Sequence, residues 1–104
     1  MNVEGEIILN TRKITEYLLV WKAESDKSTF LMNLGYSLDN WQELERDIRQ
    51  IIDQGNPIYS RPAPFGGDLY KVSGLLRNFE VVTIWLYASE PLSWRFVTLY
   101  PSKT

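Results

Sequence analysis

The 104-residue sequence contains no cysteine and no histidine. The missing cysteine excludes disulfide bonds, thiolate metal sites and cysteine nucleophiles. The missing histidine excludes Ser-His-Asp triads, Cys-His pairs and histidine-ligated metals. Any catalysis by this chain must therefore move protons through lysine, tyrosine, arginine, a carboxylate, a hydroxyl or a group of the substrate.

The chain also lacks a strong charge of either sign, since its formal net charge is −2. Hydrophobic residues make up 44% and charged residues 23%, which is ordinary for one globular domain. We therefore expect a single domain over residues 1–104, with a helical half at about 10–54 and a strand half at about 57–101. No signal-peptide pattern and no run of membrane-spanning length is present, so the expected location is cytoplasmic, with no membrane contact.

The two halves differ in charge. Residues 1–54 carry six basic and ten acidic side chains, whereas residues 55–104 carry five basic and three acidic ones. A mild positive field is therefore expected only in the C-terminal half. The acidic pI of about 5.1 argues against strong affinity of the whole surface for RNA, because phosphate binding depends on cationic surface.

Three helices are predicted from apolar residues at helical spacing in the first half. The first is expected over residues 10–20, capped by Asn10 or Thr11. The second is expected to be capped by Ser25 or Asp26 and stopped by Gly35.

The third helix has the clearest limits. Asn40 is expected to cap it, with Glu43 in a capping box, and Gly55 is expected to end it. Its apolar stripe consists of Trp41, Leu44, Ile48, Ile51 and Ile52. The charged residues between them are expected on the solvated face.

A glycine- and proline-rich segment at residues 55–68 separates the helices from the strands. Strands are predicted over 68–76, 79–88 and 94–100 from their β-branched and aromatic residues. The short segments between them predict hairpins at 77–78 and 89–93. Ile58-Tyr59 is a candidate fourth strand, and residues 6–9 are a candidate addition at an edge. The expected class is α+β, with helices packed on one face of an antiparallel meander of three to four strands.

The two faces of this sheet should differ chemically, because side chains alternate along a strand. Aliphatic residues such as Val82, Ile84 and Leu86 are expected to meet the helices. The other face then carries Lys71, Ser73, Thr83, Trp85, Thr98 and Tyr100. Arg95 falls on the core side by alternation, so we expect it at the rim of the sheet. A single bulge would exchange the faces beyond it.

A face of aromatic, hydroxyl and cationic residues suits single-stranded RNA, because bases stack on Trp and Tyr while cations meet phosphates. The same residue types also occur where a half-buried sheet packs, so the pattern leaves both interpretations open. RNA cleavage without metal uses the ribose 2′-hydroxyl as nucleophile and needs cations at the phosphate. The candidates for this chemistry are Lys27, Lys71, Arg95, Tyr70 and Tyr100.

Other chemistry finds little support. The carboxylates between Glu43 and Asp53 spread around their helix instead of pairing, which is unfavourable for a metal site or a glycosidase. The glycine-containing residues 64–68 lack the spacing of a phosphate loop and predict a turn. No cofactor and no metal is therefore expected.

Three stretches carry a resemblance to a known family: a Lys-x-x-Phe-x-x-x-Leu-Gly helix end at residues 27–35, a Val-Thr-x-Trp strand at 82–85, and a closing Val-Thr-x-Tyr-Pro at 97–101. The chain resembles, over about residues 13–101, a family of small bacterial domains that occur beside a small partner gene and as tips of polymorphic toxins. Its order of elements also looks like the barnase and RelE-type ribonuclease toxin group.

The resemblance implies a metal-independent endoribonuclease neutralised by a cognate antitoxin or immunity protein. It would place Lys27 and Arg95 at the scissile phosphate and Tyr100 or Lys71 in proton transfer. The implied substrate contacts are a stacking Trp85 and the hydroxyl donors Thr83 and Thr98. Many ribonuclease toxins of this group use histidine or a dense basic cluster, and this chain has neither.

Two alternatives stay open at the level of sequence. The first is a non-catalytic interaction module of the same fold that binds a small partner protein through its aromatic face. The second is a structural or regulatory protein without a site. Convergence of Lys27, Arg95 and Tyr100 in one cleft would favour catalysis, whereas placement on opposite faces would oppose it.

Overall fold

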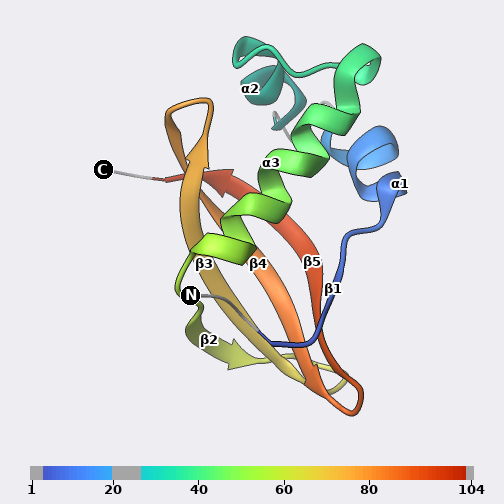
Figure 1. Ribbon diagram of the computed structural model, residues 1–104, viewed down its shortest axis with the longest axis vertical. Helices are drawn as coiled ribbons and strands as arrows, with labels where there is room; N and C mark the ends of the chain where they lie inside the picture. The colour runs from blue at the N-terminus through green and yellow to red at the C-terminus, as the bar shows by residue number, and fades with distance from the viewer. Residues whose placement is uncertain (1–3, 20–26, 103–104) are drawn as a thin grey trace.

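The computed structural model describes residues 4–19 and 27–102, and its helices and strands form an α+β fold. In chain order the elements are β1 (Glu6–Ile8), α1 (Thr11–Lys13), α2 (Lys27–Asn33), α3 (Trp41–Gln54), β2 (Ile58–Pro62), β3 (Asp68–Leu76), β4 (Phe79–Ser89) and β5 (Leu92–Pro101). A π-helical segment, Ile14–Leu18, continues α1, and a 3-10 turn, Leu38–Asn40, precedes α3. Figure 1 shows α3 crossing the sheet, with α1 and α2 near one end.

The described strands form one sheet in the order β1-β5-β4-β3-β2. The meander β2 to β5 is antiparallel, as predicted, and the candidate strand at Ile58-Tyr59 is its edge strand β2. The sheet is nevertheless mixed, because β1 adds to β5 in parallel. The last hairpin is tighter than predicted: β4 and β5 are joined by Glu90 and Pro91 alone, through a cis peptide bond.

The first helical segment begins where the sequence predicts. Asn10 is its N-cap, with the side chain accepting a hydrogen bond from the Arg12 amide at 2.9 Å. The predicted cap of α2 at Ser25 or Asp26 lies outside the described residues. Gly35 follows α2 with a φ of 94°, which is the left-handed conformation expected of a helix stop.

The predicted cap of α3 is wrong in its contacts, although the limits of the helix agree. Asn40 occupies the N-cap position but its side chain does not cap α3. It instead accepts from the Ser37 amide at 2.7 Å and donates to the Gly35 carbonyl at 3.0 Å. The reason is the preceding 3-10 turn, whose own capping box uses the Asn40 amide group. Glu43 completes no capping box with Asn40 and pairs with Arg77 in the β3–β4 turn.

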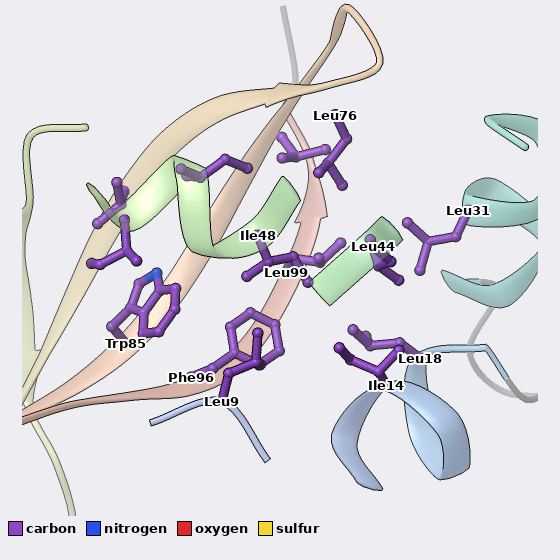
Figure 2. Close-up of a cluster of buried hydrophobic side chains, with 14 of the residues drawn as sticks. Leu9, Ile14, Leu18, Leu31, Leu44, Ile48, Leu76, Trp85, Phe96 and Leu99 are labelled. Atoms are coloured by element: carbon purple, nitrogen blue, oxygen red, sulfur yellow. The ribbon is translucent and has the colours of Figure 1, made fainter. Parts of the chain in front are cut away.

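The helices cover the opposite set of β4 side chains from the one predicted. Val81, Thr83 and Trp85 are buried under the helices, whereas Val82 and Ile84 lie on the other face. Figure 2 shows Trp85 in the buried cluster, together with Ile48 of α3. The predicted alternation along β4 is confirmed, but the predicted covered face is wrong. The face with Trp85 packs against the helices because aromatic rings bury more apolar surface than aliphatic side chains.

An irregularity in β5 changes the face on which its residues lie. Phe96 is opposite Trp85 and Thr98 is opposite Ile84, so Val97 is an extra residue without a partner on β4. The Val97 carbonyl accepts a hydrogen bond from Lys13 Nζ at 3.1 Å. Phe96 and Leu99 are consequently both buried although they are three residues apart. Beyond this bulge, Thr98 and Tyr100 share a face with Ile84 and Val82.

α3 approaches the sheet closely at Gly74 of β3. A Cβ atom at this position would lie 2.7 Å from Ile51 Cγ1 and 2.8 Å from Ile51 Cγ2. Both distances are shorter than real carbon–carbon contacts, so the helix can pack here only because residue 74 has no side chain.

We expect Gly74→Ala to lower the free energy of unfolding by about 1–3 kcal/mol, because the added methyl group overpacks the contact with Ile51. Urea denaturation followed by circular dichroism measures this change. Ser73→Ala, on the adjacent and exposed position, is the matched control and should change stability by about 0.5 kcal/mol or less. Equal effects of the two substitutions would contradict this account of the packing.

A second contact joins the β3–β4 turn to the helices. Arg77 and Asn78 form the turn with φ values of 50° and 71°. The Arg77 guanidinium lies 4.3 Å from the ring centroid of Tyr36, donates to the Leu34 carbonyl at 3.2 Å and pairs with Glu43. Arg77 therefore holds the turn against the segment between α2 and α3.

The buried Tyr36 anchors this contact from the helical side. Its hydroxyl donates to Asp47 Oδ2 at 2.6 Å, and burial followed by this hydrogen bond raises the pKa of Tyr36 above its usual value near 10. A raised pKa means that the protonated phenol is favoured in the folded state. The resulting stability is complete below about pH 10 and is lost as the pH rises through the folded-state pKa.

Tyr36→Phe should therefore lower the free energy of unfolding at pH 7 by about 1–3 kcal/mol, because Asp47 Oδ2 loses its donor. The variant should also lose less stability than the wild type between pH 9 and pH 11. Urea unfolding across this range tests both effects. Tyr59→Phe, at a half-exposed tyrosine, is the control and should keep the wild-type alkaline profile; an identical profile for Tyr36→Phe would refute the assignment.

Candidate functional site

The face of the sheet opposite α3, called here the outer face, contains several of the predicted site residues. Cross-strand pairing aligns Lys71 of β3 with Ile84 of β4, and Ile84 with Thr98 of β5. Tyr100 is aligned with Val82 one step along the same face. Lys71 is exposed, and Thr98 and Tyr100 are partly exposed, so all three are accessible from solvent.

A cleft of about 410 Å³ crosses this outer face. It is lined by residues from four strands: Ser60, Arg61, Leu69, Lys71, Ile84, Val97, Thr98 and Tyr100. The structure thus brings together three of the predicted residues, Lys71, Thr98 and Tyr100. It adds Arg61, which sequence reasoning missed because this residue lies in the glycine- and proline-rich segment and follows a strand that was only a candidate.

Lys27 reaches the wall of this cleft from α2. Its Nζ donates to Thr98 Oγ1 at 2.7 Å and lies 5.5 Å from the ring centroid of Tyr17. A threonine hydroxyl that accepts a hydrogen bond keeps its own proton for donation. Lys27 therefore acts on the cleft through Thr98, and it strengthens that hydroxyl as a donor because the bond is charge-assisted.

Arg95 lies on the outer face but does not line the cleft. It is opposite Leu86 of β4 and next to Ile8 of β1, and it is exposed. The alternation that puts Arg95 on the core side is wrong, because Trp94 and Phe96 point inward, and Arg95 is exposed next to β1. Lys27, Arg95 and Tyr100 therefore do not all converge in one cleft: Tyr100 lines it, Lys27 bonds to Thr98 of its lining, and Arg95 stands apart from it.

Thr83 and Trp85 lie in the core, and their predicted placement on the exposed face was wrong. Both residues have no exposed surface. Trp85 Nε1 donates to Thr83 Oγ1 at 2.7 Å, and Thr83 Oγ1 donates to the Val72 carbonyl at 2.7 Å. This buried chain satisfies the indole N–H, so the two side chains serve packing and are not accessible to a substrate.

The described cations are distributed unevenly between the two sides of the protein. The arginines of the helices and of the β3–β4 turn each have a carboxylate partner, in the pairs Arg12–Glu16, Arg46–Asp47, Arg49–Glu45 and Arg77–Glu43. Within the described part of the chain, Arg61, Lys71 and Arg95 of the outer face form no ion pair. The carboxylates that share this face by pairing are Glu80, opposite Leu75, and Glu6, opposite Ser93. The outer face therefore has an excess of unneutralised positive charge.

A second cleft, of about 470 Å³, lies between the polar side of α3 and β1. Its lining includes Arg46 and Arg49, and both are already paired with carboxylates. Among residues 4–19 and 27–102, no three acidic side chains gather where they could hold a metal ion. The outer cleft is therefore the better candidate for a functional site, because its charges are available to a ligand.

A family model with the description domain of unknown function, DUF6883, matches residues 1–103. The chain belongs to this family. Neither the curated proteins nor the solved structures include a match to the chain. No helix within the described residues has the length and apolar character needed to cross a membrane.

The buried position of Thr83 leads to a test. Thr83→Val keeps the shape of the side chain but leaves Trp85 Nε1 without its acceptor, so the free energy of unfolding should fall by about 1–3 kcal/mol. Chemical denaturation monitored by tryptophan fluorescence measures the change. Thr98→Val is a matched substitution at a partly exposed threonine and should lower the free energy of unfolding by less. Unchanged stability of Thr83→Val would show that the hydrogen-bond chain does not support the core.

Proposed function

We propose that the protein is a metal-independent endoribonuclease and that the cleft on the outer face binds and cleaves single-stranded RNA. One observation carries the proposal: unpaired cations, a tyrosine and a lysine-supported hydroxyl lie together in an open cleft of a chain whose net charge is negative. Cations without carboxylate partners are available to phosphate groups, which single-stranded RNA presents along its backbone.

The cleft provides a separate contact for each part of a nucleotide. Lys71 and Arg61 offer positive charge to phosphate oxygens from β3 and β2. Thr98 offers its hydroxyl proton from the opposite wall, supported by Lys27. The aliphatic side chains of Leu69 and Ile84 lie between these polar groups and provide an apolar surface for ribose and base.

The chemistry requires only groups that the cleft and the substrate contain. The ribose 2′-oxygen bonds to the adjacent phosphorus while the bond from phosphorus to the 5′-oxygen breaks, which yields a 2′,3′-cyclic phosphate and a free 5′-hydroxyl. The 2′-hydroxyl loses a proton and the leaving 5′-oxygen gains one. We assign these two proton transfers to Tyr100 and Lys71. Thr98 and the cations stabilise the charge that develops on the phosphate oxygens.

The proposal extends to compartment and partner. We place the activity in the cytoplasm, and we expect a small cognate protein of the antitoxin or immunity type to neutralise it by covering the outer face. An inhibitor of this kind would present carboxylates to Arg61, Lys71 and Arg95, because these described cations of the outer face lack an ion pair. This part of the proposal rests on the family resemblance stated above.

The second candidate function is a non-catalytic protein-interaction module, and one observation favours it. All residues of the edge strand β2 are exposed, including Ile58 at 67% and Tyr59 at 53%. An edge strand with free backbone groups and exposed apolar side chains suits a partner that adds a strand. The two functions differ in whether the purified protein alone breaks RNA.

The experiment incubates the purified protein with a synthetic single-stranded RNA in the presence of EDTA. We expect cleavage to products that end in a 2′,3′-cyclic phosphate, and no cleavage of the DNA of the same sequence, which lacks the nucleophile. Lys71→Met and Tyr100→Phe should each reduce the cleavage rate by about 100-fold or more. Arg12→Gln removes an equal charge from the helical side and should cleave like the wild type.

Two results would overturn the proposal. One is an intact RNA after prolonged incubation with folded wild-type protein, which would favour the interaction module. The other is cleavage that neither Lys71→Met nor Tyr100→Phe reduces, because the activity would then belong to another site or to a contaminant.

A further inference from the structure

A second bulge, in β2, directs Arg61 into the cleft. Tyr59 is opposite Tyr70 and Arg61 is opposite Leu69, so Ser60 is an extra residue between them. Without this extra residue, Ser60 would be opposite Leu69 and Arg61 would be opposite Asp68, on the side of the sheet that faces the helices. The bulge therefore moves Arg61 to the outer face, where Leu69 and Lys71 lie.

Two independent bulges thus aim side chains at one cleft from its two sides. The bulge at Ser60 contributes Arg61 on β2, and the bulge at Val97 contributes Thr98 and Tyr100 on β5. Both bulge residues, Ser60 and Val97, line the cleft themselves. Bulges concentrate beside functional sites because they reorient a side chain that regular pairing would send elsewhere.

The pairing also fixes how the cations are spaced. Arg61 is opposite Leu69, which is two residues before Lys71 on β3, so Arg61 and Lys71 are diagonal neighbours about 7–8 Å apart between Cα atoms. Thr98 lies in the cross-strand row of Lys71, two strand spacings or about 10 Å away. The polar groups therefore follow a line that crosses the strands from β2 to β5.

From this arrangement we infer that Arg61 binds the phosphate adjacent to the one that Lys71 and Thr98 hold, so that the cleft binds two consecutive phosphates of one RNA chain. The inference rests on the proposed function and deepens it. The RNA crosses the β-strands, with one phosphate over Lys71 and the next toward the edge strand β2. The ribose between them lies over Leu69, an apolar side chain of the cleft floor.

Charge at the two positions supports this assignment. Arg61 and Lys71 are on adjacent strands, and neither forms an ion pair within the described residues. Two like charges on neighbouring strands repel, and nothing in the cleft lining offsets this repulsion, because the lining contains no carboxylate. Two linked phosphates would neutralise both cations at once.

The experiment measures binding of 2′-O-methyl oligonucleotides without terminal phosphates, which cannot be cleaved because the nucleophile is blocked. The dinucleotide carries one phosphate and the trinucleotide carries two. For the wild-type protein at low salt, we expect the trinucleotide to bind about tenfold more tightly than the dinucleotide. Arg61→Gln should abolish this gain and lower the slope of log affinity against log salt concentration by about 0.7.

Two further variants separate the positions. Lys71→Met should weaken binding of the dinucleotide as well as of the trinucleotide, because it removes a phosphate contact that both oligonucleotides make. Arg12→Gln, which lowers the net charge equally on the helical side, should keep the tenfold gain. Circular dichroism of each variant confirms folding, which the substitution of the exposed Arg61 should not disturb.

The outcomes distinguish this inference from the proposed function. A gain for the trinucleotide that persists in Arg61→Gln would overturn the assignment of Arg61. An Arg61-dependent gain with no cleavage of the unmodified trinucleotide would support the phosphate position and overturn the nuclease. Failure of the wild-type protein to bind either oligonucleotide would overturn both.

Discussion

The bulge at Val97 in β5 is the constraint on which both faces of the sheet depend. One residue beyond regular pairing places Phe96 and Leu99 together in the core and turns Thr98 and Tyr100 to the outer face. Lys13 supports this irregularity by donating to the carbonyl of Val97, the residue that has no partner on β4. The core and the candidate site are thus two consequences of the same local geometry.

The helical side supplies the rigidity that this geometry needs. The contact of α3 with β3 at Gly74 buries Ile51, and the contact of Tyr36 with Arg77 joins the β3–β4 turn to the segment between α2 and α3. Arg12, Arg46 and Arg49 of the helices, and Arg77 of the β3–β4 turn, each pair with a carboxylate of the acidic N-terminal half. The cations of the outer face have no such partners, which is why a chain of net negative charge has a cleft with positive charge.

The positions of helices and strands were more predictable than the sheet face on which each side chain lies. Hydrophobic spacing and turn residues located α3 and the antiparallel meander, because periodicity reflects local backbone geometry directly. Asn40 was misread as the cap of α3, since the 3-10 turn that takes up its side chain depends on Ser37 and cannot be told from a helix start by residue type. The prediction of which face of β4 packs against the helices is also wrong. Gly74 was the available signal for the covered face, because a residue without a side chain lets a helix approach the sheet.

The candidate site was predictable in composition and only partly in position. Lys71, Thr98 and Tyr100 belong to the cleft, whereas Thr83 and Trp85 belong to the core and Arg61 was absent from the prediction. The sequence by itself determined the kinds of element and, through its lack of cysteine and histidine, the residue types that any chemistry here must use. Only the tertiary structure decided which side chains share a solvent-exposed face. The physical reason is that alternation relates neighbours along a strand, while a bulge and the choice of covered face arise from packing between segments distant in sequence.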